Sequence, residues 1–232
     1  MKIQDYNNVI VSKIKSLLND FEQYISEDGT LFLKNNSNKS FFGFSWFMSE
    51  NHKSVIFIRN TIYWVYYVEL ESILQEILVK NSLKGKGDIE GTYGSFIIDN
   101  KESNIIPYDE NLGMAIDSKT YDSVINRLKN IISLEALPFF EKWHSLNVLY
   151  EYIKDKTDDE LWDILGQFAP MKKAVILKLC NDSNYQPFMD NYFQKQKEYF
   201  EEDPEDIDNI RYYNASKELK EILDKTEPIY NL

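Results

Sequence analysis

Apolar and polar side chains alternate along the N-terminal part of the chain with the period of a helix. Apolar residues recur there at spacings of three and four, at Tyr6, Val9, Ile10, Ile14, Leu17, Leu18, Phe21 and Ile25. This spacing places them on one face of an α-helix and leaves the lysine, asparagine and glutamate between them to solvent. The pattern predicts an amphipathic helix over 5–25, ended by Glu27-Asp28-Gly29.

The period then shortens to that of strands. Segments rich in aromatic and β-branched residues lie at 30–34, 40–49, 54–59 and 61–68, with polar turn residues between them. The stretches 41–48 and 62–68 are apolar or small on both alternating faces, which is typical of strands covered on both sides or flanked by a helix and a loop. We therefore expect a central, mostly antiparallel sheet, with the aromatic stretch 63–67 in its core.

Helical spacing returns at 69–82, and a glycine-rich stretch then leads into a short strand at 95–99. After residue 120 every pattern is helical, at 121–132, 134–143, 146–154, 158–168, 171–179, 187–200 and 216–225. The predicted fold class is α+β, with the N-terminal helix on the sheet, followed by a helical C-terminal half. We expect a sheet domain over 1–144 with a helical extension over 145–232 packed on it, or one domain over 1–232, because no linker marks a boundary.

The charge balance constrains the partners. The chain has 26 basic and 38 acidic residues, a formal net charge of -12, and only three arginines among the bases. Phosphate binding uses clustered Lys and Arg, so nucleic acid is disfavoured, whereas a basic protein is electrostatically favoured. No segment has the roughly 18 uninterrupted apolar residues that span a bilayer, and the N-terminus lacks the apolar core of a secretory signal. A single cysteine allows no internal disulfide, so we expect a cytoplasmic protein without a membrane partner.

Four glycines lie within ten residues, and such glycine-rich segments occur in phosphate-binding loops; they are Gly85, Gly87, Gly91 and Gly94. A phosphate loop would continue with Lys and Ser or Thr and open a helix. Here the residues after the last glycine start a strand instead, which favours an ordinary hairpin or loop.

The side chains that most often carry catalysis or metals are scarce. His52 lies in a polar turn, and His144 follows the segment 138–143, where a cation suits the end of a helix. Cys180 follows an apolar run and is expected as a small buried residue rather than a nucleophile. No metal-ligand spacing occurs, and no pair among the many carboxylates stands out, so we assign no catalytic residue, metal or cofactor. An enzyme with a site built from scattered carboxylates and tyrosines, and a structural scaffold, remain alternatives.

The strongest local anomaly is the segment 198–208, which holds seven acids and no base. It can be a solvated loop between two helices. It can also be a docking surface for a basic protein, in which aromatic residues anchor the contact inside an acidic rim. The candidate contact residues are Tyr199, Phe200, Glu201, Glu202, Asp203, Glu205, Asp206 and Asp208, with Tyr212 and Tyr213 as further aromatic anchors.

One segment carries a resemblance to known proteins. A long N-terminal helix, an aromatic sheet and then a helix opening with Leu137-Pro138-Phe139-Phe140-Glu141-Lys142-Trp143 resemble a bacterial family of uncharacterised α+β proteins. Some members of that family are grouped with the immunity proteins of polymorphic toxin systems. The resemblance implies no catalytic motif. It implies a cytoplasmic protein that binds and neutralises a partner, and it leaves the tail 199–232 outside the shared pattern.

Overall fold

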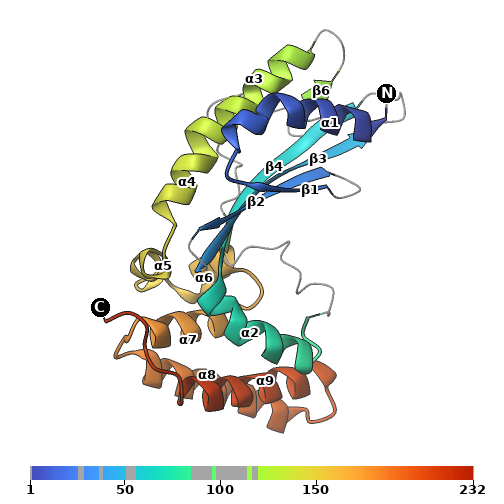
Figure 1. Cartoon of the computed structure of the whole chain (residues 1–232). Coiled ribbons are helices and arrows are strands. Elements are labelled where there is room, and N and C mark those ends of the chain that lie inside the picture. The colour runs from blue at the N-terminus through green and yellow to red at the C-terminus, as the bar shows by residue number, and fades with distance from the viewer. Residues whose placement is uncertain are drawn as a thin grey trace. The chain divides into compact units, whose positions relative to one another are not determined.

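The computed structural model describes residues 2–25, 29–36, 39–50, 56–84, 96–97, 114–116 and 120–231. Its elements confirm the α+β class: an N-terminal helix, an antiparallel sheet and then a helical C-terminal half (Figure 1). The turn at His52 and the glycine-rich stretch 85–95 lie outside the described residues. By their internal contacts the residues form two compact units, 1–65 with 97–144 and 66–96 with 145–232. Each unit is described separately below.

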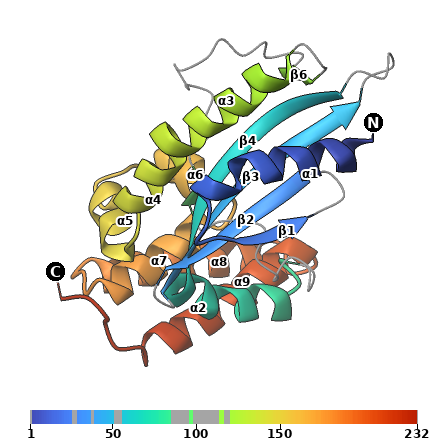
Figure 2. The same cartoon turned by 45° about the horizontal axis from the view of Figure 1, so that its top comes forward.

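The first unit is built on the sheet. Its strands are β1 (Glu22–Ile25), β2 (Gly29–Asn36), β3 (Ser40–Glu50), β4 (Ile56–Tyr67), β5 (Phe96–Ile97) and β6 (Met114–Ile116), of which β4 and β5 extend into the second unit. They are ordered β1-β2-β3-β4-β5, with β6 paired to β4. The pairs β1–β2, β2–β3 and β4–β6 are antiparallel. Helices α1 (Ile3–Ile14) and α3 (Tyr121–Ile131) lie side by side over this sheet (Figures 1 and 2).

Two predicted elements of this unit are wrong in their limits. The N-terminal helix stops at Ile14, passes through a 3₁₀ turn at Lys15–Leu17, and residues 22–25 form β1 instead of a last helical turn. Backbone pairing of β1 with β2 replaces the helical hydrogen bonds there. The two strands predicted at 54–59 and 61–68 are one strand, β4, which runs without a break through the polar residues between them.

The expected coverage of the aromatic strands holds in part. In β4, Tyr63, Trp64 and Val65 are all buried, so both faces are covered and the core assignment is confirmed. In β3 the even-numbered residues from Ser40 to Met48 are buried, but Phe47 on the other face is 42% exposed, so full coverage of both faces, one of the two arrangements expected, is wrong there.

The core of this unit is aromatic. The ring of Phe140, in α4 (Leu137–Lys142), lies 5.0 Å from Phe42 and 5.9 Å from Phe21. Its neighbour Phe139 lies 5.0 Å from Tyr63. The Pro-Phe-Phe segment that carried the family resemblance therefore supplies core packing. It continues α3 through a π-helical turn, Ile132–Ala136, rather than starting a separate helix.

Among its described residues, the second unit is mostly helical, and it also includes the ends of β4 and β5. It contains α2 (Val68–Lys80), α5 (Leu146–Ile153), α6 (Asp158–Leu165), α7 (Ala169–Leu179), α8 (Tyr185–Glu202) and α9 (Ile207–Leu223). The apolar faces of α2, α7 and α9 meet in its core, with Leu70, Leu74, Val175, Leu219 and Leu223 among the fully buried side chains. The division predicted at residue 144 shares one boundary with these units, but it grouped 66–96 with the sheet.

Candidate functional site

The acidic segment 198–208 occupies the connected ends of α8 and α9. Residues 198–202 form the last turn of α8, and α9 begins at Ile207, nine residues before the predicted start of that helix at 216. The segment is therefore mostly helical, and its connector is only 203–206. Asp206 is the reason for the early start, since its Oδ1 accepts hydrogen bonds from the backbone N–H groups of Asp208 at 2.8 Å and Asn209 at 2.9 Å.

Further hydrogen bonds fix this connector. Asp203 Oδ1 accepts from the backbone N–H of Glu205 at 3.3 Å. The Asn209 side-chain amide donates to the carbonyl of Tyr199 at 3.0 Å and to that of Asp203 at 3.3 Å. Two of the predicted contact residues, Asp203 and Asp206, thus have local structural roles in shaping the turn.

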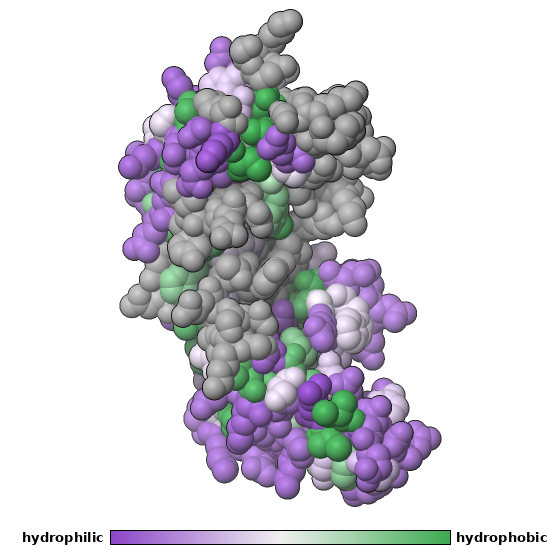
Figure 3. All heavy atoms as spheres, turned by 90° about the vertical axis from the view of Figure 1, so that its right-hand side faces the viewer, coloured by the Kyte–Doolittle hydropathy of each residue, from purple (hydrophilic) through white to green (hydrophobic). Residues whose placement is uncertain are grey.

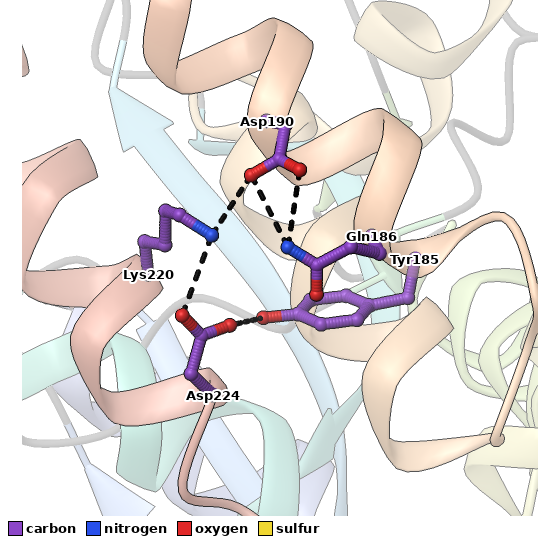
Figure 4. A network of polar contacts seen from close by, with 5 residues as sticks. All are labelled: Tyr185, Gln186, Asp190, Lys220 and Asp224. Carbon is purple, nitrogen blue, oxygen red and sulfur yellow. Dashed lines mark hydrogen bonds and ion pairs between the residues drawn. The ribbon is translucent and has the colours of Figure 1, made fainter.

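The opposite ends of the two helices are joined by a polar network (Figure 4). Lys220 of α9 donates to Asp190 of α8 at 2.8 Å and to Asp224 at 3.3 Å, and the Tyr185 hydroxyl donates to Asp224 at 3.1 Å. The hydrogen bond from Lys220 lowers the pKa of Asp190, and the hydrogen bond to Asp190 raises the pKa of Lys220. With this network at one end and the turn at the other, α8 and α9 form a braced hairpin.

Aromatic stacking supports the hairpin between these ends. The rings of Phe200 and Tyr213 are 4.9 Å apart and nearly parallel, at 5°, and Phe193 stacks on Tyr213 from 5.8 Å. Phe200 and Tyr213, both predicted as partner anchors, therefore contact each other inside the hairpin. Tyr199, by contrast, is 51% exposed.

The carboxylates fall into two groups. Glu201 pairs with Lys197 at 3.5 Å, and Asp208 pairs with Arg211 at 3.3 Å. Glu202 and Glu205 are exposed and form no side-chain hydrogen bond or ion pair with any described residue. Glu198 accepts only from the Gln194 amide, at 3.0 Å.

An exposed surface remains at the end of the hairpin, which we call the acidic tip: Glu198, Tyr199, Glu202, Glu205 and Ile207. Ile207 is 59% exposed, and sequence reasoning missed it because it was read as part of a loop. The side view in Figure 3 shows the bottom of the molecule, where α8 and α9 lie, as mostly hydrophilic surface with a small hydrophobic patch. Chemically, this surface can accept hydrogen bonds and cations around apolar contacts.

The structural expectations for the remaining candidates are met where they are described. Cys180 is fully buried, and burial, followed by nearby carboxylates, raises the pKa of its thiol to about 12. The thiol is therefore protonated at neutral pH and unsuited to nucleophilic attack. His144 follows α4, is exposed, and its Nδ1 lies 2.8 Å from the carbonyl of Glu141.

A buried carboxyl group in the second unit was not anticipated. Glu71 of α2 is 4% exposed, and its Oε1 has no hydrogen-bond partner among the described residues. Burial lowers the pKa of Lys172 on α7, and the Glu71 carboxylate acts in the opposite direction. Lys172 also donates to the carbonyl of Leu165 at 2.8 Å. The attraction of Glu71 thus offsets part of the cost of burying the Lys172 ammonium group.

The described residues hold no group of three or more side chains suited to a metal ion. Over the same residues, no helix combines the length and apolarity needed to cross a bilayer. Comparison with known proteins gives no further assignment, since no family model, curated protein or solved structure matches the chain.

Proposed function

We propose that this chain is a non-enzymatic, cytoplasmic binding protein that occupies a basic protein partner through the acidic tip. An immunity-type inhibitor, which neutralises a toxin by covering it, is the role that fits this proposal. The observation that carries it is the exposure of unpaired glutamates beside an exposed tyrosine and isoleucine, on a hairpin braced at both ends.

The position of the acids supports a role beyond folding. Glu201 and Glu202 lie in the last turn of α8, where the negative end of the helix dipole disfavours carboxylates. Glu198 and Glu202 are four residues apart on the same helix, and like charges at this spacing cost about 0.2–0.5 kcal/mol. The positive end of α9 is already occupied by Asp206 and Asp208. This arrangement weakens the isolated chain, and a cationic partner would relieve the repulsion.

The composition of the tip also fits a protein contact. Tyrosine is enriched among residues that dominate binding energy, and surrounding polar groups keep water from such anchors. Tyr199 and Ile207 supply the apolar centre, and the three glutamates supply a rim of one sign. The rim would speed association with a basic surface and reject acidic ones.

The first test neutralises the tip without disturbing the turn. The triple variant Glu198→Gln, Glu202→Gln, Glu205→Gln leaves Asp203, Asp206 and both ion pairs in place. A matched control, Glu22→Gln, Asp122→Asn, Glu141→Gln, makes the same change in net charge at exposed positions of the sheet unit. A partner captured from the host is identified by mass spectrometry, purified and titrated against all three proteins at low and high salt.

We expect the tip variant to bind roughly 3-fold to 150-fold more weakly, since exposed charge contacts contribute about 0.2–1 kcal/mol each. The control variant should bind as the original protein does, and added salt should weaken the original complex more than that of the tip variant. Equal losses in both variants would mean that only net charge matters, and a complex insensitive to salt and to the tip variant would refute the proposal.

A further inference from the structure

Helix α6 presents a second aromatic side chain to solvent, outside the acidic tip. The chain has four tryptophans, and all four are described. Trp46, Trp64 and Trp143 are between 0% and 3% exposed, whereas Trp162 is 50% exposed. Trp46 donates its indole N–H to Asn7 at 3.0 Å, and the ring of Trp143 lies 6.3 Å from that of Phe139. Trp162 is the exception that needs explaining.

Trp162 lies outside the buried face of α6. Leu161 and Leu165 bury the inner face of α6, and Trp162 lies on its flank. Within the described part of the chain, its indole makes no hydrogen bond, ring contact or cation contact. Elsewhere, cations do lie over exposed rings, as Lys156 does over Tyr152 at 5.7 Å.

Three aspartates lie close to Trp162 along α6. Asp158 and Asp159 lie one helical turn before Trp162, and Asp163 is its neighbour. The dipole of α6 explains Asp158 and Asp159 in the first turn, but it does not explain Asp163 or the ring. None of the three aspartates pairs with a cation among the described residues, while Glu160 on the other flank is taken by Lys156 at 2.7 Å.

We infer that Trp162, Asp158 and Asp159 bind an arginine side chain of a basic protein segment. A guanidinium group can stack flat on an indole and still donate hydrogen bonds at its edge, to carboxylates placed beside the ring. A lysine ammonium group fits less well, because it is a point charge and more strongly hydrated. The inference rests on the proposed function only in taking the partner to be positively charged. Its residues are different from those of the acidic tip.

The exposed indole allows a direct test on the full chain. In ¹⁵N-labelled protein, each tryptophan gives one side-chain N–H resonance, and Trp162→Phe identifies the one that belongs to Trp162. The probes are an end-capped peptide of glycine-spaced arginines and two matched peptides that carry lysine or the neutral isostere citrulline. We expect the arginine peptide to shift the Trp162 resonance saturably and to leave the three buried indoles unchanged. The lysine peptide should bind several-fold more weakly, and the citrulline peptide should cause no shift.

Variants test whether binding depends on Trp162, Asp158 and Asp159, which we call the platform, or only on the protein's overall negative charge. Trp162→Leu should weaken arginine-peptide binding at this site by about fivefold, the scale of an exposed cation–π contact. Asp158→Asn with Asp159→Asn should have a similar effect, whereas Glu22→Gln with Asp122→Asn changes net charge equally and should have none. Amide spectra check that each variant remains folded.

The failures of the two proposals are distinguishable. If the arginine peptide shifts amides of the acidic tip but not the Trp162 indole, the platform is refuted and the tip retains its support. Binding at Trp162 that survives both Trp162→Leu and the aspartate changes would equally overturn the inference. Loss of partner binding in the tip variant alone would leave the platform untouched.

Discussion

At the scale of single residues, Gly43 of β3 lies directly against the ring of Trp64 of β4. A Cβ atom at Gly43 would lie 2.1 Å from Cζ2 of the buried Trp64 ring. Gly43→Ala should therefore lower the free energy of unfolding by about 1–3 kcal/mol, the usual cost of overpacking a core, as measured by denaturant titration. The matched control is the same change in a Trp64→Leu background, where the smaller side chain leaves room and the cost should shrink. Strictly additive costs would contradict this explanation.

At the scale of elements, α6 begins with a reciprocal cap that should respond to pH. The Thr157 hydroxyl accepts from the Glu160 backbone N–H, and the Glu160 carboxylate accepts from the Thr157 backbone N–H at 2.9 Å. The hydrogen bond from Lys156, followed by those from Thr157, lowers the pKa of Glu160 to about 2. Because the folded pKa is depressed, this stabilisation is present above the ordinary glutamate pKa of about 4.3 and is lost as pH falls towards 2.

Amide exchange in the first turn of α6 measures this loss. We expect exchange at Leu161 to accelerate as pH falls through that window, beyond the intrinsic pH dependence of exchange. Glu160→Gln should remove the additional change, because its amide does not titrate. Glu141→Gln, at an exposed glutamate on α4, is the control and should leave it in place. An unchanged profile in Glu160→Gln would mean that the cap does not control the helix end.

The elements also show how far sequence reasoning reaches. The fold class and most C-terminal helices were predicted to within a few residues, because their buried faces repeat at helical spacing. The predicted helix 5–25 is too long, because Phe21 and Ile25 continue the helical spacing by coincidence. Phe21 instead packs on Phe140, a contact that no local sequence pattern indicates. The start of α9 was predictable in principle, because Asp is among the residues preferred at an N-cap and Asp206 precedes the helix.

The same limit applies to the candidate sites. The acidic run was visible as composition, but its division into turn-forming aspartates and unpaired glutamates depends on hydrogen bonds formed only in the fold. Phe200 and Tyr213 looked like partner anchors because stacking between two helices has no signature in sequence. The exposure of Trp162 has no sequence signature either. A tryptophan at helical spacing is expected in the core, and its exposure depends on how α6 packs in the fold.

At the scale of the whole molecule, both compact units are discontinuous in sequence, and this predicts how the chain tolerates cutting. The second unit needs α2, which is separated from its other helices by the segment 97–144. Leu70, Leu74, Ile77 and Leu78 of α2 are between 0% and 1% exposed. Burying such side chains contributes about 1.5–3 kcal/mol each, so together they approach the whole stability of an ordinary domain, about 5–15 kcal/mol.

A fragment of residues 145–232 should therefore fail to fold cooperatively, although it contains five of the helices. We expect a broad thermal transition by circular dichroism and binding of a hydrophobic dye, since the faces of α7 and α9 that α2 covers would be open. A peptide of residues 66–84 added in trans should restore a sharp transition by supplying α2. The same peptide with Leu70→Asp and Leu74→Asp is the control and should not. Cooperative unfolding of the fragment alone would show that the helical half is an independent domain after all, as a division at residue 144 implies.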